Sequence, residues 1–217
     1  MTIHSREFRS AALLGTPSEV GTDALFGVSA AQPATLFSAG SEIYAQGEKA
    51  GELYLIEFGA VRVYRLLADG RRQISSFHLA GEVFGFEAGG THHFFAESIG
   101  ATGIRVIRAG HGADRSHELL PLVLQGLVKA QEHLLVLGRQ HAAERVAAFL
   151  LDMAARQGDL EEFDLPMSRG DIADYLGLTI ETVSRVFSRM KDKGIVRLPS
   201  LRRVCIQKWE TLRSMSE

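Results

Sequence analysis

The chain has 217 residues, of which 46% are hydrophobic and 23% charged, a composition typical of a globular protein with one large domain or two ordinary ones. No run approaches eighteen apolar residues, and the first ten residues carry charges where a secretory signal has its apolar core, so we expect neither a membrane span nor export. The single cysteine, Cys205, excludes an internal disulfide and by itself cannot hold zinc or an iron–sulfur cluster, which suits a cytoplasmic protein.

Positive charge is concentrated near the C-terminus, although the net charge is -2. Residues 1–138 contain 11 Lys and Arg against 14 Asp and Glu, whereas residues 185–208 contain eight bases and one acid. Such a local excess of bases is either a solvated helix surface or an electrostatic footprint for phosphates.

The spacing of glycines organises the first half of the chain. Eight of them, from Gly40 to Gly110, recur at intervals of eight to eleven residues, which is typical of short strands joined by tight turns. The segments rich in β-branched and aromatic side chains are residues 53–58, 60–67, 72–79 and 103–109. We therefore expect an antiparallel β-roll over residues 23–112, preceded by an N-terminal extension of residues 1–22.

A helical period begins at about His117. Residues spaced four and three apart predict one long helix over residues 113–140 with a seam along one face, continuing to Gly138 and His141. The seam residues are Leu120, Leu124, Leu127, Gln131 and Leu134. The seam packs either on the chain's own β-roll or on a second copy. A polar Gln131 favours the second copy, because it can pair with itself across a two-fold axis, and we expect a homodimer.

Residues 141–217 are expected to form the last domain. It begins with a helix over residues 142–158 that ends at Gly158, and an acidic segment over residues 159–164 serves as a connector.

Two short helices are predicted by "SRGDIADYLGLTIETVSRVFSRMKDKG", residues 168–194. Ser168 and Asp171 form a variant of the capping box at the start of the first helix, and Gly177 ends that helix. Thr179 caps the second helix. Two short helices joined by a tight turn with a glycine are typical of a helix-turn-helix, in which the N-terminal end of the second helix meets base edges.

The second of these helices has an apolar and a polar side. The residues spaced to face a core are Val183, Val186, Phe187 and Met190. The polar residues on its other faces are Glu181, Ser184, Arg185 and Arg189. A core does not require those four side chains. The following residues, 195–207, are expected to form a small β-hairpin or wing.

At these residues the sequence resembles a known family. "SRGDIADYLGLTIETVSRVFSRMKDKGIV" is similar to the DNA-binding domain of the CRP/FNR superfamily of bacterial transcription regulators, and "ERVAAFLLDMA" resembles the helix that leads into it. Upstream, "GELYLIEFGAVRVY" and "GEVFGFEA" resemble the family's β-roll, so the likeness covers about residues 25–207. It implies an α+β protein: an N-terminal antiparallel β-roll of jelly-roll type, similar to a cyclic-nucleotide-binding domain, then a long dimerisation helix and a C-terminal winged helix-turn-helix.

The resemblance also implies a function. Within the superfamily, "ETVSR" resembles the FNR and FixK branches, which read TTGAT-type half-sites. We therefore expect a dimeric, sequence-specific regulator of transcription that binds a palindromic site on double-stranded DNA, an activator that contacts RNA polymerase.

By this resemblance the base-reading residues are Glu181, Ser184 and Arg185. An arginine can donate two hydrogen bonds to guanine O6 and N7, a glutamate can accept one from cytosine N4, and a serine can meet either kind of group. The candidates for contacts to the DNA backbone are Ser168, Arg169, Thr179, Thr182, Arg189, Arg202 and Arg203. For the two wing arginines, an exposed hairpin without a fixed contact is the alternative.

The residues of the expected β-roll limit which effector such a regulator can bind. Relatives that bind cyclic AMP hold its phosphate with an Arg-Ser pair, whereas Phe94 and Phe95 stand about there in this chain, so a buried cyclic phosphate would lack its counter-charge. Residues 1–22 contain no cysteine for the iron–sulfur cluster of the FNR branch. The resemblance implies a FixK-like regulator that needs no cofactor. The alternative is the same architecture controlled by an unidentified, apolar ligand lined by Phe94 and Phe95.

Enzymatic chemistry is not expected. His92 and His93 with Glu97 faintly resemble the metal-binding segment of cupin barrels, but adjacent histidines point to opposite sides of a strand, and we expect no metal. The sequence contains no Gly-rich phosphate loop, GxSxG elbow or HExxH helix. Cys205 is expected to be a packed or idle thiol in the wing; the alternative is a redox site whose oxidation beside the phosphates weakens DNA binding.

Overall fold

The structure is a computed structural model that describes residues 33–108 and 116–216. The predicted extension, residues 1–22, and the beginning of the predicted β-roll lie outside the described residues. None of the helices in the described ranges combines the length and apolar character that crossing a membrane requires.

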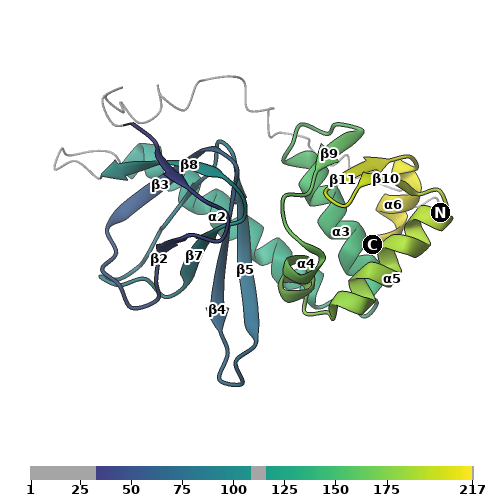
Figure 1. Cartoon of the computed structure of the whole chain (residues 1–217), viewed down its shortest axis with the longest axis horizontal. Helices are drawn as coiled ribbons and strands as arrows, with labels where there is room; N and C mark the ends of the chain where they lie inside the picture. The colour runs from purple at the N-terminus through teal and green to yellow at the C-terminus, as the bar shows by residue number, and fades with distance from the viewer. Residues whose placement is uncertain (1–32, 109–115, 217) are drawn as a thin grey trace, which may run out of the picture. The chain divides into compact units, whose positions relative to one another are not determined.

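Residues 33–108 form antiparallel strands in two four-stranded sheets (Figure 1). One sheet has the strand order β1-β8-β3-β6 and the other β2-β7-β4-β5. The strands are β1 Thr35–Phe37, β2 Glu42–Tyr44, β3 Glu52–Phe58, β4 Ala60–Leu66, β5 Arg72–Leu79, β6 Val83–Phe84, β7 Phe95–Ser98 and β8 Thr102–Arg108. The predicted antiparallel β-roll is confirmed. Its core is a cluster of buried side chains: Tyr44, Ile56, Val61, Val63, Phe84, Ala96 and Ile104.

The β4–β5 hairpin is the longest paired ladder of the roll. It runs in antiparallel register from the pair Ala60 and Leu79 to the pair Leu66 and Arg72. Gly70 closes its turn with φ 82°, a left-handed conformation that glycine adopts without strain. Both strands of the hairpin extend beyond the other strands of their sheet, β2 and β7 (Figure 1).

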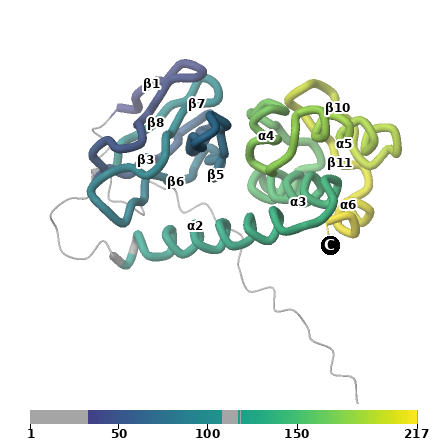
Figure 2. The backbone as a smooth tube through the Cα atoms, turned by 90° about the horizontal axis from the view of Figure 1, so that it is seen from below, coloured from purple at the N-terminus to yellow at the C-terminus, as the bar shows by residue number. Residues whose placement is uncertain are grey.

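One continuous helix, α2 (Ser116–Leu137), follows the roll (Figure 2). The predicted helix over residues 113–140 is confirmed as an element, but its predicted C-terminal end is wrong. Gly138 lies just after the helix, and His141 is the N-cap of the next one. A glycine and a capping position redirect the chain there, so the helix ends three residues before its predicted end and the seam loses its last two predicted positions.

We predicted that the next helix ends at Gly158, but helix α3 (Ala142–Ala155) ends three residues earlier. Residues 156–158 already form a turn, in which Gly158 has φ 87°. The acidic segment after it is more than a connector. It contains β9 (Glu162–Asp164), which pairs with β11 (Arg203–Ile206) about forty residues later, so the prediction of a plain connector was wrong.

The remaining elements are α4 (Arg169–Leu176), α5 (Ile180–Asp192), β10 (Val196–Ser200) and a terminal helix that the sequence did not suggest to us, α6 (Trp209–Met215). The strands form a three-stranded sheet of order β10-β11-β9. A shared core joins this sheet to α3, α4 and α5, with Leu150, Met153, Ile172, Leu176 and Phe187 almost fully buried. Helices α4 and α5 with the β10–β11 hairpin are the predicted winged helix-turn-helix.

Candidate nucleic-acid interface

The two predicted helix starts of the helix-turn-helix are present with their caps. Ser168 Oγ accepts a hydrogen bond from the Asp171 amide at 3.0 Å, and the Asp171 carboxylate accepts one from the Ser168 amide at 3.0 Å. Gly177 ends α4 with φ 63°. Thr179 Oγ1 accepts from the Thr182 amide at 3.2 Å and so caps α5. These bonds satisfy amides that the first turn of a helix leaves unpaired, and they fix where α5 begins.

Helix α5 separates core from surface as the sequence predicted. The buried residues are Val183, Val186, Phe187 and Met190. Glu181, Ser184 and Arg185 are exposed and occupy the first two turns of the helix. The structure therefore brings the three predicted base readers together at the N-terminal end of α5, which is the end that a recognition helix presents to base edges.

The two charged residues among these three, Glu181 and Arg185, lie near each other. Arg185 Nε donates to the backbone carbonyl of Glu181 at 3.3 Å. Hydrogen bonds with its own backbone and with Thr179 keep the pKa of Glu181 below its usual range. Glu181 is therefore an ionised acceptor at neutral pH, beside a guanidinium that is a donor only.

The residues predicted to contact the DNA backbone differ in how far their side chains are already engaged within the protein. Ser168 and Thr179 are exposed, but their hydroxyl groups already serve in caps. The guanidinium carbon of Arg169 lies 3.3 Å from the centroid of the Phe187 ring, and its Nη1 is buried without a hydrogen-bond partner among the described residues. Burial lowers the pKa of Arg169 to about 10, so this arginine stays charged at neutral pH.

On the wing, the two candidate arginines are not equivalent. Arg203 donates to Asp164 at 3.0 Å and lies 3.5 Å from Glu162, so much of its charge is neutralised within the protein. Arg202 is exposed, and its guanidinium forms no ion pair with any residue in the described ranges. Arg189, near the end of α5, is exposed as well.

Cys205 lies in the middle of the wing sheet. It is directly opposite Arg197 on one side and Glu162 on the other, and these two residues form an ion pair of 3.0 Å. Val204 and Ile206 are buried, whereas Cys205 is half-buried, so the thiol faces away from the core as predicted.

The predicted seam of α2 lies open in the single chain. Leu120, Leu124, Leu127 and Leu134 are 50–67% exposed, and Gln131 is exposed. Within the described residues the seam does not pack on the chain's own roll, which favours the second copy over that alternative. Three residues of α2 that contact the rest of the chain, Lys129, His133 and Val136, lie on the opposite side of the helix at 100° per residue.

Within the roll, Glu82 is engaged by the chain itself. Its carboxylate accepts from Arg156 at 2.8 Å and from Lys129 at 2.9 Å. Burial opposes ionisation of Glu82, but the charges of Arg156 and Lys129 outweigh it and lower the pKa to about 2. The sequence contained no signal for this contact, because Arg156 is 74 residues from Glu82 along the chain.

The other residues considered for ligand or metal chemistry are placed as follows. Phe95 stacks on Tyr64, with 5.3 Å between the ring centroids. His92 is buried against Tyr44 and His93 is exposed, and both face the carboxylate of Glu87. Glu97 pairs with Arg62 instead, so the structure does not bring together the three residues of the cupin-like reading.

Comparison with known proteins gives the same assignment for both halves of the chain. A cyclic nucleotide-binding domain model matches residues 34–109 and a Crp-like helix-turn-helix model matches residues 144–215. The nitrogen fixation regulation protein FixK of Rhizobium meliloti (strain 1021) is 55% identical over 179 residues, which are 82% of this chain and 85% of that protein. The fumarate and nitrate reduction regulatory protein of Vibrio cholerae serotype O1 is 34% identical over 72% of this chain and 68% of its own length.

A solved structure, FixK2 from Bradyrhizobium japonicum, superposes with a TM-score of 0.79 at 41% identity, over 85% of this chain and 98% of that one. These relatives are regulators of transcription and not enzymes, as the sequence predicted. The chain is a DNA-binding transcription regulator of the CRP/FNR family, and within that family it is FixK-like.

Proposed function

We propose that the protein binds, as a homodimer and without a bound cofactor, a palindromic promoter site with TTGAT-type half-sites. Residues 141–217 carry the DNA-reading unit, residues 113–140 the dimer contact, and residues 23–112 the roll. The observation that carries the proposal is the polar face of α5, where Glu181, Ser184 and Arg185 are exposed together. One G·C pair offers an acceptor pair to Arg185 and a donor to Glu181, which fits the single G·C pair of a TTGAT half-site.

The proposed backbone contacts surround that face. Helix N-termini and arginines are the usual partners of phosphates, and they set the register in which the base readers work. The residues proposed for this role are Ser168, Arg169, Thr179, Thr182, Arg189, Arg202 and Arg203.

Dimerisation is supported by the exposed seam of α2. An apolar stripe of this length on a helix favours a partner helix, because its leucines otherwise remain in water. Gln131 lies in the stripe, where two copies related by a two-fold axis place their amides side by side. A two-fold dimer presents two copies of α5, which accounts for a palindromic site.

Activity without a cofactor is supported by the residues around Glu82 and Phe95. The carboxylate of Glu82 is already paired with two cations of the chain, and Phe95 is stacked on Tyr64. An anionic ligand in the roll would have to compete with Glu82 for Arg156 and Lys129. The alternative, an apolar ligand lined by Phe94 and Phe95, predicts instead that DNA binding needs an added effector.

As an activator, the protein would contact RNA polymerase in the cytoplasm, where promoter DNA is found. Cys205 enters the proposal as an idle thiol, because its neighbours are an ion pair of the wing and not a second thiol. Peroxide footprinting of the native protein and a Cys205→Ser variant tests this. A loss of binding in the native protein alone would make Cys205 the redox site.

A gel-shift experiment with the purified protein and no added effector tests the proposed function. The duplex carries TTGAT-N4-ATCAA, and the matched control keeps one half-site and scrambles the other. We expect retention of the palindrome at concentrations at least ~100-fold lower than for the control, because binding two linked half-sites adds avidity. Equal retention of both duplexes contradicts palindromic recognition, and retention only after a small molecule is added supports the apolar-ligand alternative.

A further inference from the structure

Asp171 does more than cap helix α4. Its side chain is 5% exposed, which is unusual for an acid whose capping role is met at a helix surface. The Oδ1 atom accepts from Arg62 of β4 at 3.2 Å and from Arg72 of β5 at 2.6 Å, while Oδ2 accepts from Ser168. A buried carboxylate is tolerated only when it is paired, so the two arginines of the roll account for the burial of Asp171.

A second contact lies one turn further along α4. Arg72 donates to Asp174 Oδ2 through Nε at 2.9 Å and Nη2 at 2.8 Å, so its guanidinium bridges two carboxylates of the helix. Gln73 Nε2 donates to the backbone carbonyl of Asp174 at 2.6 Å. Planar, multiply bonded arginine contacts of this kind fix orientation as well as distance. We call Arg62, Arg72 and Gln73 with Asp171 and Asp174 the roll–α4 clamp.

Aromatic side chains of β5 and α2 also pack against helix α4. Tyr175 of α4 stacks on His133 of α2 with 3.8 Å between ring centroids, and lies 5.0 Å from the ring of Phe77 in β5. Helix α4 is thus held by β4, β5 and α2 at once.

Contacts that fix the position of α4 also fix the position of α5. The two helices share one core through Ile172, Leu176, Val183 and Phe187. The covalent connection between α2 and the DNA-reading unit runs through the turn at residues 138–141, which by itself allows the unit to swing. Two recognition helices reach successive major grooves only at a fixed separation of about 34 Å, so such swinging would weaken recognition of a palindrome.

We propose that Arg72 and Gln73, with Arg62, are positioning residues for DNA binding: the roll–α4 clamp fixes the orientation of the recognition helix and so does the work that a bound effector does in ligand-controlled regulators. This inference rests on the proposed function, because the clamp matters only for a protein that is active without an effector. The three residues do not contact DNA in this account. They act through Asp171 and Asp174.

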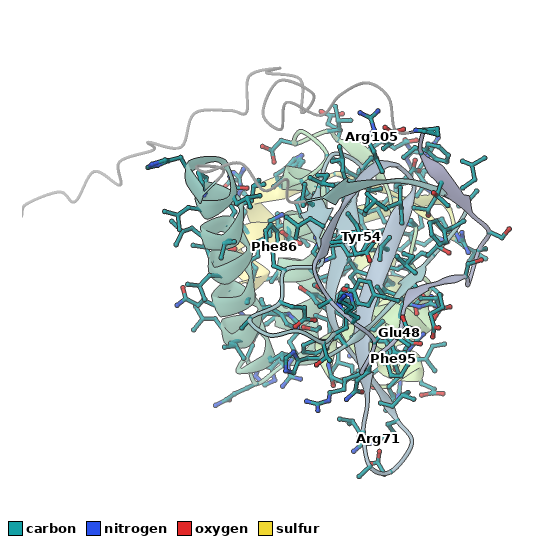
Figure 3. All side chains as sticks on the ribbon, turned by 90° about the vertical axis from the view of Figure 1, so that its left-hand side faces the viewer. Glu48, Tyr54, Arg71, Phe86, Phe95 and Arg105 are labelled. Carbon is teal, nitrogen blue, oxygen red and sulfur yellow. The ribbon has the colours of Figure 1, made fainter. Side chains whose placement is uncertain are left out.

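The test uses the full chain and the double variant Arg72→Ala/Gln73→Ala, which removes the hydrogen bonds from β5 to α4. Asp171 is left intact because its loss would also destroy the cap of α4. The matched control is Arg71→Ala, which removes the same charge from the same hairpin. Arg71 is exposed at the hairpin turn, pairs only with Asp69 in the described structure, and points away from the rest of the protein (Figure 3).

The first measurement needs no DNA. Spin labels at Leu67→Cys in the hairpin and Glu210→Cys in α6, in a Cys205→Ser background diluted with unlabelled protein, report the distance between roll and DNA-reading unit. We expect a narrow distance distribution for the unsubstituted clamp and for Arg71→Ala, and a broad one for the double variant. For Arg72→Lys we expect a distribution narrower than that of the double variant. A distribution that stays narrow in the double variant overturns the proposal.

The second measurement is affinity for the palindrome without effector. We expect the double variant to bind about 5- to 20-fold more weakly than Arg71→Ala, which lies within the usual range for coupling between two sites. Equal affinities of these two variants overturn the proposal even if the distances broaden, and so does a loss of affinity without broadening. If the unsubstituted protein does not prefer the palindrome, the proposed function fails, whereas the distance measurement still decides whether the clamp orients the DNA-reading unit.

Discussion

At the scale of single residues, the proposed recognition of DNA depends on the first two turns of α5. Arg185 can bond a guanine at two atoms, and no other exposed side chain of those turns offers two parallel donors. Glu181 lies one turn before it and is ionised, so it accepts hydrogen bonds but cannot donate them.

Replacing Arg185 with Ala is therefore expected to cost about 1–3 kcal/mol of binding free energy at the palindrome and to relax specificity at one base pair of each half-site. Anisotropy titrations with duplexes substituted at each position measure this. Lys191→Ala is the matched control, since Lys191 is exposed in the last turn of α5 and its loss should weaken binding to all duplexes alike. An Arg185→Ala protein that still discriminates every base pair would refute its role as a reader.

His133 is expected to make stability depend on pH. Burial against Tyr175 lowers its pKa to about 4, whereas the ordinary value is 6.5. Between these values the unfolded chain binds a proton that the folded chain does not. The contribution of His133 to the free energy of unfolding should therefore be fully present above pH 6.5. It should fall by about 1–2 kcal/mol as the pH is lowered toward 4.

Urea unfolding at several pH values, compared between the native protein and His133→Phe, measures this contribution. The difference in free energy of unfolding between the two proteins should change between pH 6.5 and pH 4. Parallel profiles for the native protein and His133→Phe would show that the ring of His133 is not held neutral.

At the scale of elements, the two arginines of the wing are expected to contribute unequally to contacts with phosphate. Arg203 is already paired with Asp164, whereas Arg202 is exposed. We expect Arg202→Ala to flatten the dependence of log K on log salt by about one ion, and Arg203→Ala to flatten it by clearly less. Titrations at several salt concentrations give both slopes. If the two variants flatten the dependence equally, the internal pairing of Arg203 does not limit its contact with phosphate.

The helix-turn-helix could be predicted from sequence because its signals are local. The cap at Ser168, the left-handed Gly177 and the buried and exposed faces of α5 each depend on residues within one or two turns. The acidic segment around Glu162 could not be recognised as a strand, because it becomes one only by pairing with β11. The clamp was equally hidden, since Arg72 and Asp171 are 99 residues apart.

At the scale of the whole molecule, dimerisation decides whether one α5 or two meet the DNA. A charge in the open seam of α2 would be buried without a partner in the dimer. Leu127→Glu is therefore expected to give a monomer in sedimentation and to lower affinity for the palindrome about 100-fold or more. Gln125→Glu adds the same charge to another exposed face of α2 and should leave the dimer intact. A Leu127→Glu protein that sediments as a dimer would place the interface elsewhere.

The central claim is that this chain, with nothing bound, reads a palindrome through two copies of α5. Selection of bound duplexes from a random pool by the purified protein alone tests it most directly. We predict enrichment of two inverted TTGAT-type half-sites whose centres lie about one helical turn apart. A selected pool without a shared motif, or with a single half-site and no inverted partner, would contradict the account.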